Sequence, residues 1–178
     1  MTLNALSFNA VAPEAAAVDF IAAMGKCVSG VTVVTTDGPG GRFGLTVSAM
    51  SSVSAEPPLL LVCINRNNLA CSAIDRNGCF AVNVLTGAQQ QIAQVFAGQL
   101  PVAGGDRFAC ASWMEQHTGA PVLGQALASF DCYLEQQINL GSHAVFVGRV
   151  AQAQSAEGSA LAYSQRIFGT LNADANAK

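Results

Sequence analysis

The sequence predicts a mostly β protein: an antiparallel barrel of five or six strands with a few flanking helices. Runs of β-branched and apolar residues of strand length recur along the chain. Segments rich in Gly, Pro and Asn separate them, and few stretches have apolar residues at helical spacing. Because 51% of the 178 residues are hydrophobic, we expect residues 1–178 to form one domain with a sizeable core, with flexible termini at roughly 1–12 and 172–178.

A helix and a β-hairpin are the first elements that the sequence predicts. Pro13 to Met24 fits a helix, because proline suits a first turn and Gly25 can end it. Residues 31–36, VTVVTT, favour a half-buried strand because most of their side chains are β-branched. Residues 37–41, DGPGG, supply the chain reversal, and residues 43–48 return as the partner strand.

Strands and helices alternate in the middle of the predicted chain. Residues 59–64 form a continuous apolar run whose length fits a strand buried on both faces. Residues 65–68 can cap a short helix through about Arg76, which Asn77-Gly78 stops. Residues 79–85 again indicate a strand, and residues 88–97 indicate a second surface helix.

The remaining elements are a long loop and a second strand pair. Residues 98–119 show no clear period and contain Pro101, and long loops of this kind often bind ligands. Residues 129–138 and 143–154 predict two strands joined by Asn139 to Ser142.

Composition argues against several classes of partner. Net charge is −3 and the eight basic residues are scattered, so we expect no nucleic-acid and no anionic-membrane surface. The six cysteines form no CxxC pair and only two histidines occur, so we expect no metal site. The N-terminus lacks signal-peptide features and no apolar run is long enough to cross a membrane, which predicts a cytoplasmic protein with reduced thiols.

A cluster of small hydroxyl residues follows the hairpin: Thr46, Ser48, Ser51, Ser52 and Ser54. Their hydroxyl and backbone N–H groups could surround an anionic or amide-bearing ligand, which Gly44 would let the backbone approach closely. The alternative is a Ser-rich turn, since Ser and Thr bond locally to backbone groups. Residue chemistry alone slightly favours that alternative.

An ordered set of segments resembles the flavin reductase family. In chain order they are GVTVVTT, GLTVSAMSSVSAEPPLLLVCINR, FAVNVL, GDRF, GSHAVFVGRV and LAYSQRIFGTL, which together span roughly Phe20 to Leu171. The resemblance implies an FMN-binding split β-barrel, a homodimer, and the reductase component of a two-component flavin-dependent monooxygenase. Asn67-Asn68-Leu69 departs from the family, where many relatives have a Ser- and Thr-rich turn.

The resemblance also implies where the flavin binds. The residues that would line its ring, with main-chain N–H groups near O2, N3 and O4, are Thr46, Val47, Ser48 and Ala49, and Ser51, Ser52 and Ser54 extend this wall. The residues that would hold the ribityl and phosphate end, beside a helix N-terminus, are Asn65, Arg66, Asn67 and Asn68. The alternative for Arg66 is a solvated surface charge.

Five further residues complete the predicted site. Asn83 is a lone amide in an apolar strand and needs a partner, which is either the cofactor or the backbone. The resemblance places His143 on the nicotinamide side, as a positional hydrogen-bond donor to the pyridine nucleotide; otherwise it is a half-exposed turn residue. Phe108 belongs to the loop over that pocket, and Tyr163 and Phe168 resemble aromatic residues that close the cofactor edge.

These observations predict an NAD(P)H:flavin oxidoreductase. It would transfer a hydride from NADH, or NADPH, to FAD or FMN and supply diffusible reduced flavin to a separate monooxygenase that hydroxylates aromatic compounds. The chain has no GxGxxG or P-loop motif and no recognisable catalytic triad, and hydride transfer between two cofactors needs none. The alternatives are a pyridoxamine phosphate oxidase-like split-barrel oxidase and a non-catalytic flavin-binding protein.

Overall fold

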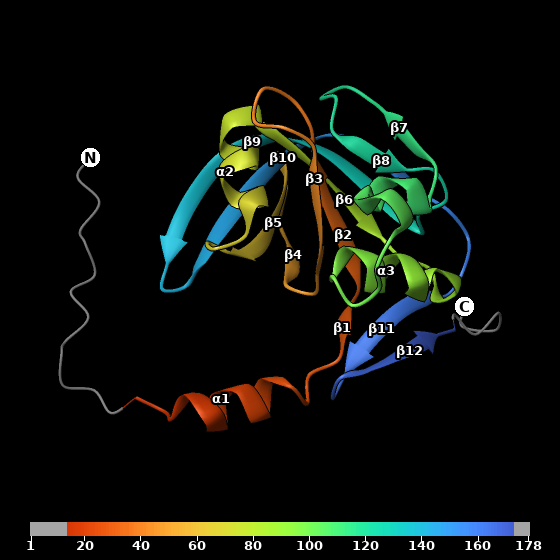
Figure 1. Ribbon diagram of the computed structural model, residues 1–178. Coiled ribbons are helices and arrows are strands. Elements are labelled where there is room, and N and C mark those ends of the chain that lie inside the picture. The colour runs from red at the N-terminus through yellow and green to blue at the C-terminus, as the bar shows by residue number, and fades with distance from the viewer. Residues whose placement is uncertain (1–13, 173–178) are drawn as a thin grey trace, which may run out of the picture.

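A seven-stranded antiparallel sheet forms the centre of the computed structural model, which describes residues 14–172 (Figure 1). The sheet has the order β3-β2-β6-β9-β10-β5-β4. Its strands are β2 (Thr32–Thr36), β3 (Phe43–Val47), β4 (Met50–Ala55), β5 (Pro58–Asn65), β6 (Cys79–Val84), β9 (Ala128–Leu140) and β10 (His143–Ser155). The two edge strands, β3 and β4, follow each other in the chain without pairing, so the sheet is split there. The predicted flexible termini lie almost entirely outside the described residues.

Two small sheets and short helices complete the fold. One sheet has the order β1-β11-β12, and the other pairs β7 with β8. Their strands are β1 (Ser29–Gly30), β7 (Trp113–Glu115), β8 (Pro121–Leu123), β11 (Ala160–Ser164) and β12 (Ile167–Leu171). The α-helices are α1 (Ala17–Met24), α2 (Leu69–Asn77) and α3 (Gln90–Phe96), and the 3-10 turns are η1 (Gly87–Gln89), η2 (Ala103–Gly105) and η3 (Arg107–Cys110).

Strand β2 is buried along its whole length, so the prediction of a half-buried strand was wrong. Val34 packs into a core with β5, β10 and α2, whereas Val33 packs into a second core with α3 and β11. Because the strand lies between two cores, both of its faces are covered. Figure 1 shows α2 and α3 on opposite sides of β3, the next strand.

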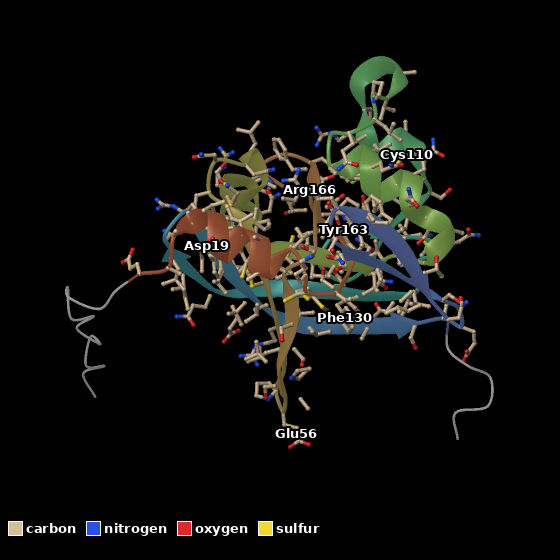
Figure 2. All side chains as sticks on the ribbon, turned by 90° about the horizontal axis from the view of Figure 1, so that it is seen from below. Asp19, Glu56, Cys110, Phe130, Tyr163 and Arg166 are labelled. Carbon is tan, nitrogen blue, oxygen red and sulfur yellow. The ribbon has the colours of Figure 1, made fainter. Side chains whose placement is uncertain are left out.

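Strand β5 shows the opposite error, because it was predicted to be buried on both faces. Leu60, Val62 and Ile64 are buried, but the intervening Leu59, Leu61 and Cys63 are only partly covered. These three residues belong to none of the core clusters of the described chain. The β4–β5 hairpin projects from the body, with Glu56 at its tip (Figure 2).

The local signals at α2 were read correctly. The Asn68 side chain accepts a hydrogen bond from the Ala70 N–H at 2.9 Å, and Gly78 ends the helix at φ 67°. Helix α1, in contrast, begins at Ala17, and none of its residues is buried; the predicted start at Pro13 lies outside the described residues. None of the helices in residues 14–172 is long and apolar enough to cross a membrane.

Candidate functional site

Two pockets lie at opposite ends of β3. The first, which we call the aromatic pocket, has a volume of about 180 Å³. It is lined by Val31, Thr46, Ser48, Ala97, Gln99, Tyr163 and Phe168. The rings of Tyr163 and Phe168 are 5.0 Å apart and tilted by 56°, so they form one wall, opposite the end of β3. The structure therefore brings together three predicted elements: the TVS segment and both closing aromatic residues.

Thr46 is the only predicted ring-lining residue with a fixed hydroxyl in this pocket. Its Oγ1 donates to the Ala93 carbonyl of α3 at 2.6 Å, so its proton is already used. Ser48 is exposed and keeps its hydroxyl available. The Val47 side chain is 6% exposed and belongs to the core, so only its main chain can reach a ligand.

The serine run forms an edge strand and not a turn. Ser51 and Ser52 are exposed on β4, and the Ser51 hydroxyl donates to the Ser52 carbonyl at 3.1 Å. Ser54 accepts from the Glu56 N–H at 3.1 Å. Ala49 connects the two edge strands, and its carbonyl accepts from the Cys63 N–H at 3.0 Å. These serines extend away from the aromatic pocket along the projecting hairpin.

The second pocket, which we call the arginine pocket, has a volume of about 440 Å³, within the range of small-molecule sites. Its lining residues are Arg42, Phe43, Gly44, Asn67, Asn68, Leu69, Gly105, Asp106, Arg107 and Phe108. It therefore combines the start of β3, the N-terminal end of α2 and the predicted GDRF loop. Two guanidinium groups and a helix N-terminus make this pocket suited to an anion.

Of the four residues predicted for the phosphate end, two line the arginine pocket and two lie outside its lining. Asn67 and Asn68 line the arginine pocket, and the Asn65 Oδ1 accepts from the Asn67 N–H at 3.0 Å. Arg66 is exposed, lies outside the lining, and donates to the Gly141 carbonyl at 3.3 Å. The cation that lines the pocket from the sheet side is Arg42, which sequence reasoning missed. Its position in the turn, two residues before Gly44, was the available signal.

Gly44 lines the arginine pocket and is the residue of β3 on which two aromatic rings pack. A Cβ at this position would lie 2.5 Å from Phe96 Cε1 and 3.3 Å from Phe108 Cζ, so only glycine lets these rings pack against β3. Gly44 and Ser48 are four residues apart, which is about 13 Å along an extended chain. A ribityl chain is suited to connect a ring at one end with a phosphate at the other.

Asn83 is not a ligand-binding residue. It is fully buried, and its Nδ2 donates to the Val33 carbonyl at 3.0 Å. Its Oδ1 accepts from the Leu123 N–H at 2.8 Å. The amide joins β6 to β2 and β8, so the partner of this polar group is the backbone.

His143 begins β10 and is exposed. Its Nδ1 lies 2.9 Å from the Ser142 Oγ, and it pairs in register with Asn65 of β5. It lines neither pocket of its own protomer. A role for His143 therefore requires a ligand that extends to this end of β5, or a second copy of the chain.

No cysteine lines either of these two pockets, and burial makes four of the thiols poor nucleophiles. Burial raises the pKa of Cys71, Cys79 and Cys110, and burial with the nearby Asp131 charge raises the pKa of Cys132 to about 12. A neutral thiol is a poor nucleophile and a poor metal ligand. The site thus provides hydroxyl groups, amides, cations and aromatic surface, which are means of binding and not of covalent catalysis.

Comparison with known proteins gives a family and named relatives. The profile of the Flavin reductase like domain matches residues 24–172. "FMN reductase (NADH) RutF 1" of Methylorubrum extorquens (strain PA1) is 46% identical over 166 residues, which cover 93% of this chain and 80% of that protein. "FMN reductase (NADH) RutF" of Variovorax paradoxus (strain S110) is 39% identical over 179 residues, covering 97% and 98%.

Solved structures give the same result. Flavin reductase PheA2 superposes with a TM-score of 0.80 at 33% identity, covering 89% of this chain and 100% of that one. BorF, the flavin reductase component of a bacterial two-component tryptophan halogenase, has a TM-score of 0.79 at 30% identity, covering 89% and 100%. A homologue of nitrilotriacetate monooxygenase component B from Mycobacterium thermoresistibile has a TM-score of 0.79 at 26% identity, covering 90% and 92%.

Proposed function

As this chain belongs to the flavin reductase-like family and is an NADH-dependent flavin reductase, we propose that it releases reduced flavin to a separate monooxygenase. The observation that supports this most is the pair of pockets joined by β3, one aromatic and one cationic. Both lie on the surface, and neither contains a buried charge that would anchor a flavin permanently. Binding by neutral and exposed groups favours release after reduction.

The residues present fit a phosphorylated flavin. Tyr163 and Phe168 offer aromatic surface for the ring, and Ser48 offers a free hydroxyl at its polar edge. Asn67 and Asn68 stand at the N-terminal end of α2, where an anion is favoured. We place the ring near Thr46 to Ala49 and the phosphate in the arginine pocket.

The bound flavin supplies the redox chemistry, since it accepts a hydride from NADH and a proton from water. The chain binds and orients both partners, which accounts for most of the rate when no covalent step is needed. We propose that main-chain N–H groups of residues 46–49 stabilise negative charge at the polar edge of the ring.

We propose that His143 positions the nicotinamide and does not transfer a proton. Its imidazole is exposed and its Nδ1 lies beside the Ser142 hydroxyl, which orients the ring. Because it lines neither pocket, this contact requires either a nucleotide that extends to this end of β5 or a second copy of the chain. Phe108 belongs to the arginine pocket and we assign it to the phosphate end.

We also propose a homodimer whose subunit boundary runs past the flavin site. On α1, Val18, Phe20 and Ile21 are 60–71% exposed, and an eight-residue helix has little stability in water without packing. The outer face of β5 is a second uncovered apolar surface. The aromatic pocket, at about 180 Å³, is smaller than typical small-molecule sites, so a second copy would complete it.

Two of the solved relatives are components of a tryptophan halogenase and of nitrilotriacetate monooxygenase, so one serves an aromatic compound and the other an aliphatic one. We propose that the partner monooxygenase of this chain hydroxylates an aromatic compound. We also propose a cytoplasmic location and the use of NADPH beside NADH.

A matched set of assays tests this function. NADH and NADPH oxidation are measured with FAD, FMN and riboflavin in turn, and each flavin is varied well above the enzyme concentration. A flavin that is a released substrate gives many turnovers and saturation with its own KM. Binding without steady NADH oxidation would instead support a flavin-storing protein.

A further inference from the structure

The Arg42 side chain lies over an aromatic ring. Its guanidinium Cζ is 4.0 Å from the centroid of the Phe108 ring, a cation–π contact on the wall of the arginine pocket. The N–H groups of a guanidinium lie in one plane. These groups match two oxygens of a phosphate, which a lysine ammonium group cannot do in the same way.

The ring under Arg42 is held rigidly. Phe108 is 8% exposed and meets Phe96 and Trp113 edge to face, at 5.2 Å and 5.1 Å between ring centroids. The Trp113 Nε1 also donates to the Phe108 carbonyl at 2.9 Å. The Phe108 ring beneath Arg42 is therefore part of the second core and not a mobile surface side chain.

The carboxylates near Arg42 leave its guanidinium N–H groups available to a ligand. The Asp37 Oδ2 lies 3.8 Å from the Arg42 Nε, and the side chains of Arg42 and Asp37 are 43% and 38% exposed, so this pair is loose and weakly bound. Asp106 accepts instead from the Phe108 N–H at 2.9 Å. Arg107 adds a second cation to the lining, and Asn67 and Asn68 place the start of α2 opposite.

We propose that Arg42, stacked on Phe108, binds the phosphate next to the ribityl chain of the flavin and thereby selects phosphorylated flavins over riboflavin. This inference rests on the proposed function, because it takes the arginine pocket as the phosphate end of the flavin site. It replaces Arg66 with Arg42 as the phosphate-binding cation. Phe108 acts as a positioning residue for the guanidinium.

The test compares flavin binding by the intact chain and three variants. FMN and riboflavin are titrated by fluorescence quenching, without NADH, into the wild type, Arg42→Gln, Arg42→Lys and Arg66→Gln. The last is the matched control, since it removes an exposed arginine that lines neither pocket and donates to the Gly141 carbonyl. Thermal unfolding of each variant checks that the fold is intact.

Wild-type protein is expected to bind FMN more tightly than riboflavin, with an advantage that shrinks as salt increases. Arg42→Gln should lower the affinity for FMN about ten- to a hundred-fold, as expected for one lost charge-assisted hydrogen bond, and leave the affinity for riboflavin unchanged. The FMN affinity of Arg42→Lys should lie between those of the wild type and Arg42→Gln, and Arg66→Gln should match the wild type. Unchanged FMN affinity in Arg42→Gln, or an equal loss for both flavins, would overturn the inference but not the reductase.

A second arm separates the flavin phosphate from the phosphates of the nucleotide. With riboflavin as acceptor, the KM for NADH should be the same in the wild type and in Arg42→Gln. A raised KM for NADH together with unchanged FMN affinity would show that Arg42 binds the nucleotide, which contradicts the assignment. Failure of the wild type to bind either flavin would refute both the inference and the proposed function.

Discussion

Replacement of Gly44 by alanine tests whether the close packing of Phe96 on β3 shapes the arginine pocket. The new Cβ would lie 2.5 Å from Phe96 Cε1 and 2.9 Å from Phe96 Cδ1, so the ring must move by about 1 Å to reach ordinary contact. Phe96 is 2% exposed and packs against both Phe108 and Trp113. A shift of Phe96 therefore also displaces the Phe108 ring beneath Arg42. Overpacking of this kind costs roughly 1–3 kcal/mol.

For a chain of this size, that cost corresponds to a fall in Tm of roughly 2–12 °C. Differential scanning fluorimetry measures it, and flavin titration should show weaker FMN binding because the arginine pocket is distorted. Gly30→Ala is the matched control, since a Cβ there meets nothing within 4 Å. If Gly44→Ala melts like the wild type and binds FMN equally well, the close packing of Phe96 on β3 does not shape the site.

Three further predictions concern single features. Ser48→Ala should weaken flavin binding by about 0.5–1.5 kcal/mol, the contribution of one neutral hydrogen bond. Thr46→Val should mainly lower Tm, because the Thr46 hydroxyl donates to the Ala93 carbonyl. Flavin titration and thermal melting separate the two effects. His143→Ala should raise the KM for NADH and leave flavin affinity and kcat largely unchanged, and a collapse of kcat at saturating NADH would show that it acts in the hydride step. Sedimentation equilibrium should show a dimer that Phe20→Asp with Ile21→Asp weakens, and a stable wild-type monomer that still turns over flavin would contradict the proposed interface.

Local signals in the sequence were sufficient where one residue decides a backbone conformation. Asn68 and Gly78 set the ends of α2, and the DGPGG turn set the β2–β3 pairing. The strands β7 and β8 have three residues each, which is too short for a periodic pattern to emerge. The long predicted loop at residues 98–119 therefore contained 3-10 turns and β7 that were not anticipated.

Burial and partner choice depend on distant segments, and this explains the errors in the site. Whether the Asn83 amide faces a ligand or the core depends on Val33 and Leu123, which lie 50 and 40 residues away in the chain. Arg42 becomes a site residue only because Phe108 is placed beneath it by its packing on Phe96 and Trp113. The segment motifs identified the family, but the geometry of the arginine pocket required the structure.

The central claim is that flavin is a diffusible substrate of this reductase. The most direct measurement places NADH and the protein on one side of a dialysis membrane, with a flavin-dependent monooxygenase and its substrate on the other, under low oxygen with added FMN. The account predicts hydroxylated product that increases with FMN concentration, although the proteins never touch. Product that forms only when the two proteins share a compartment would contradict it, and direct transfer would then replace free diffusion.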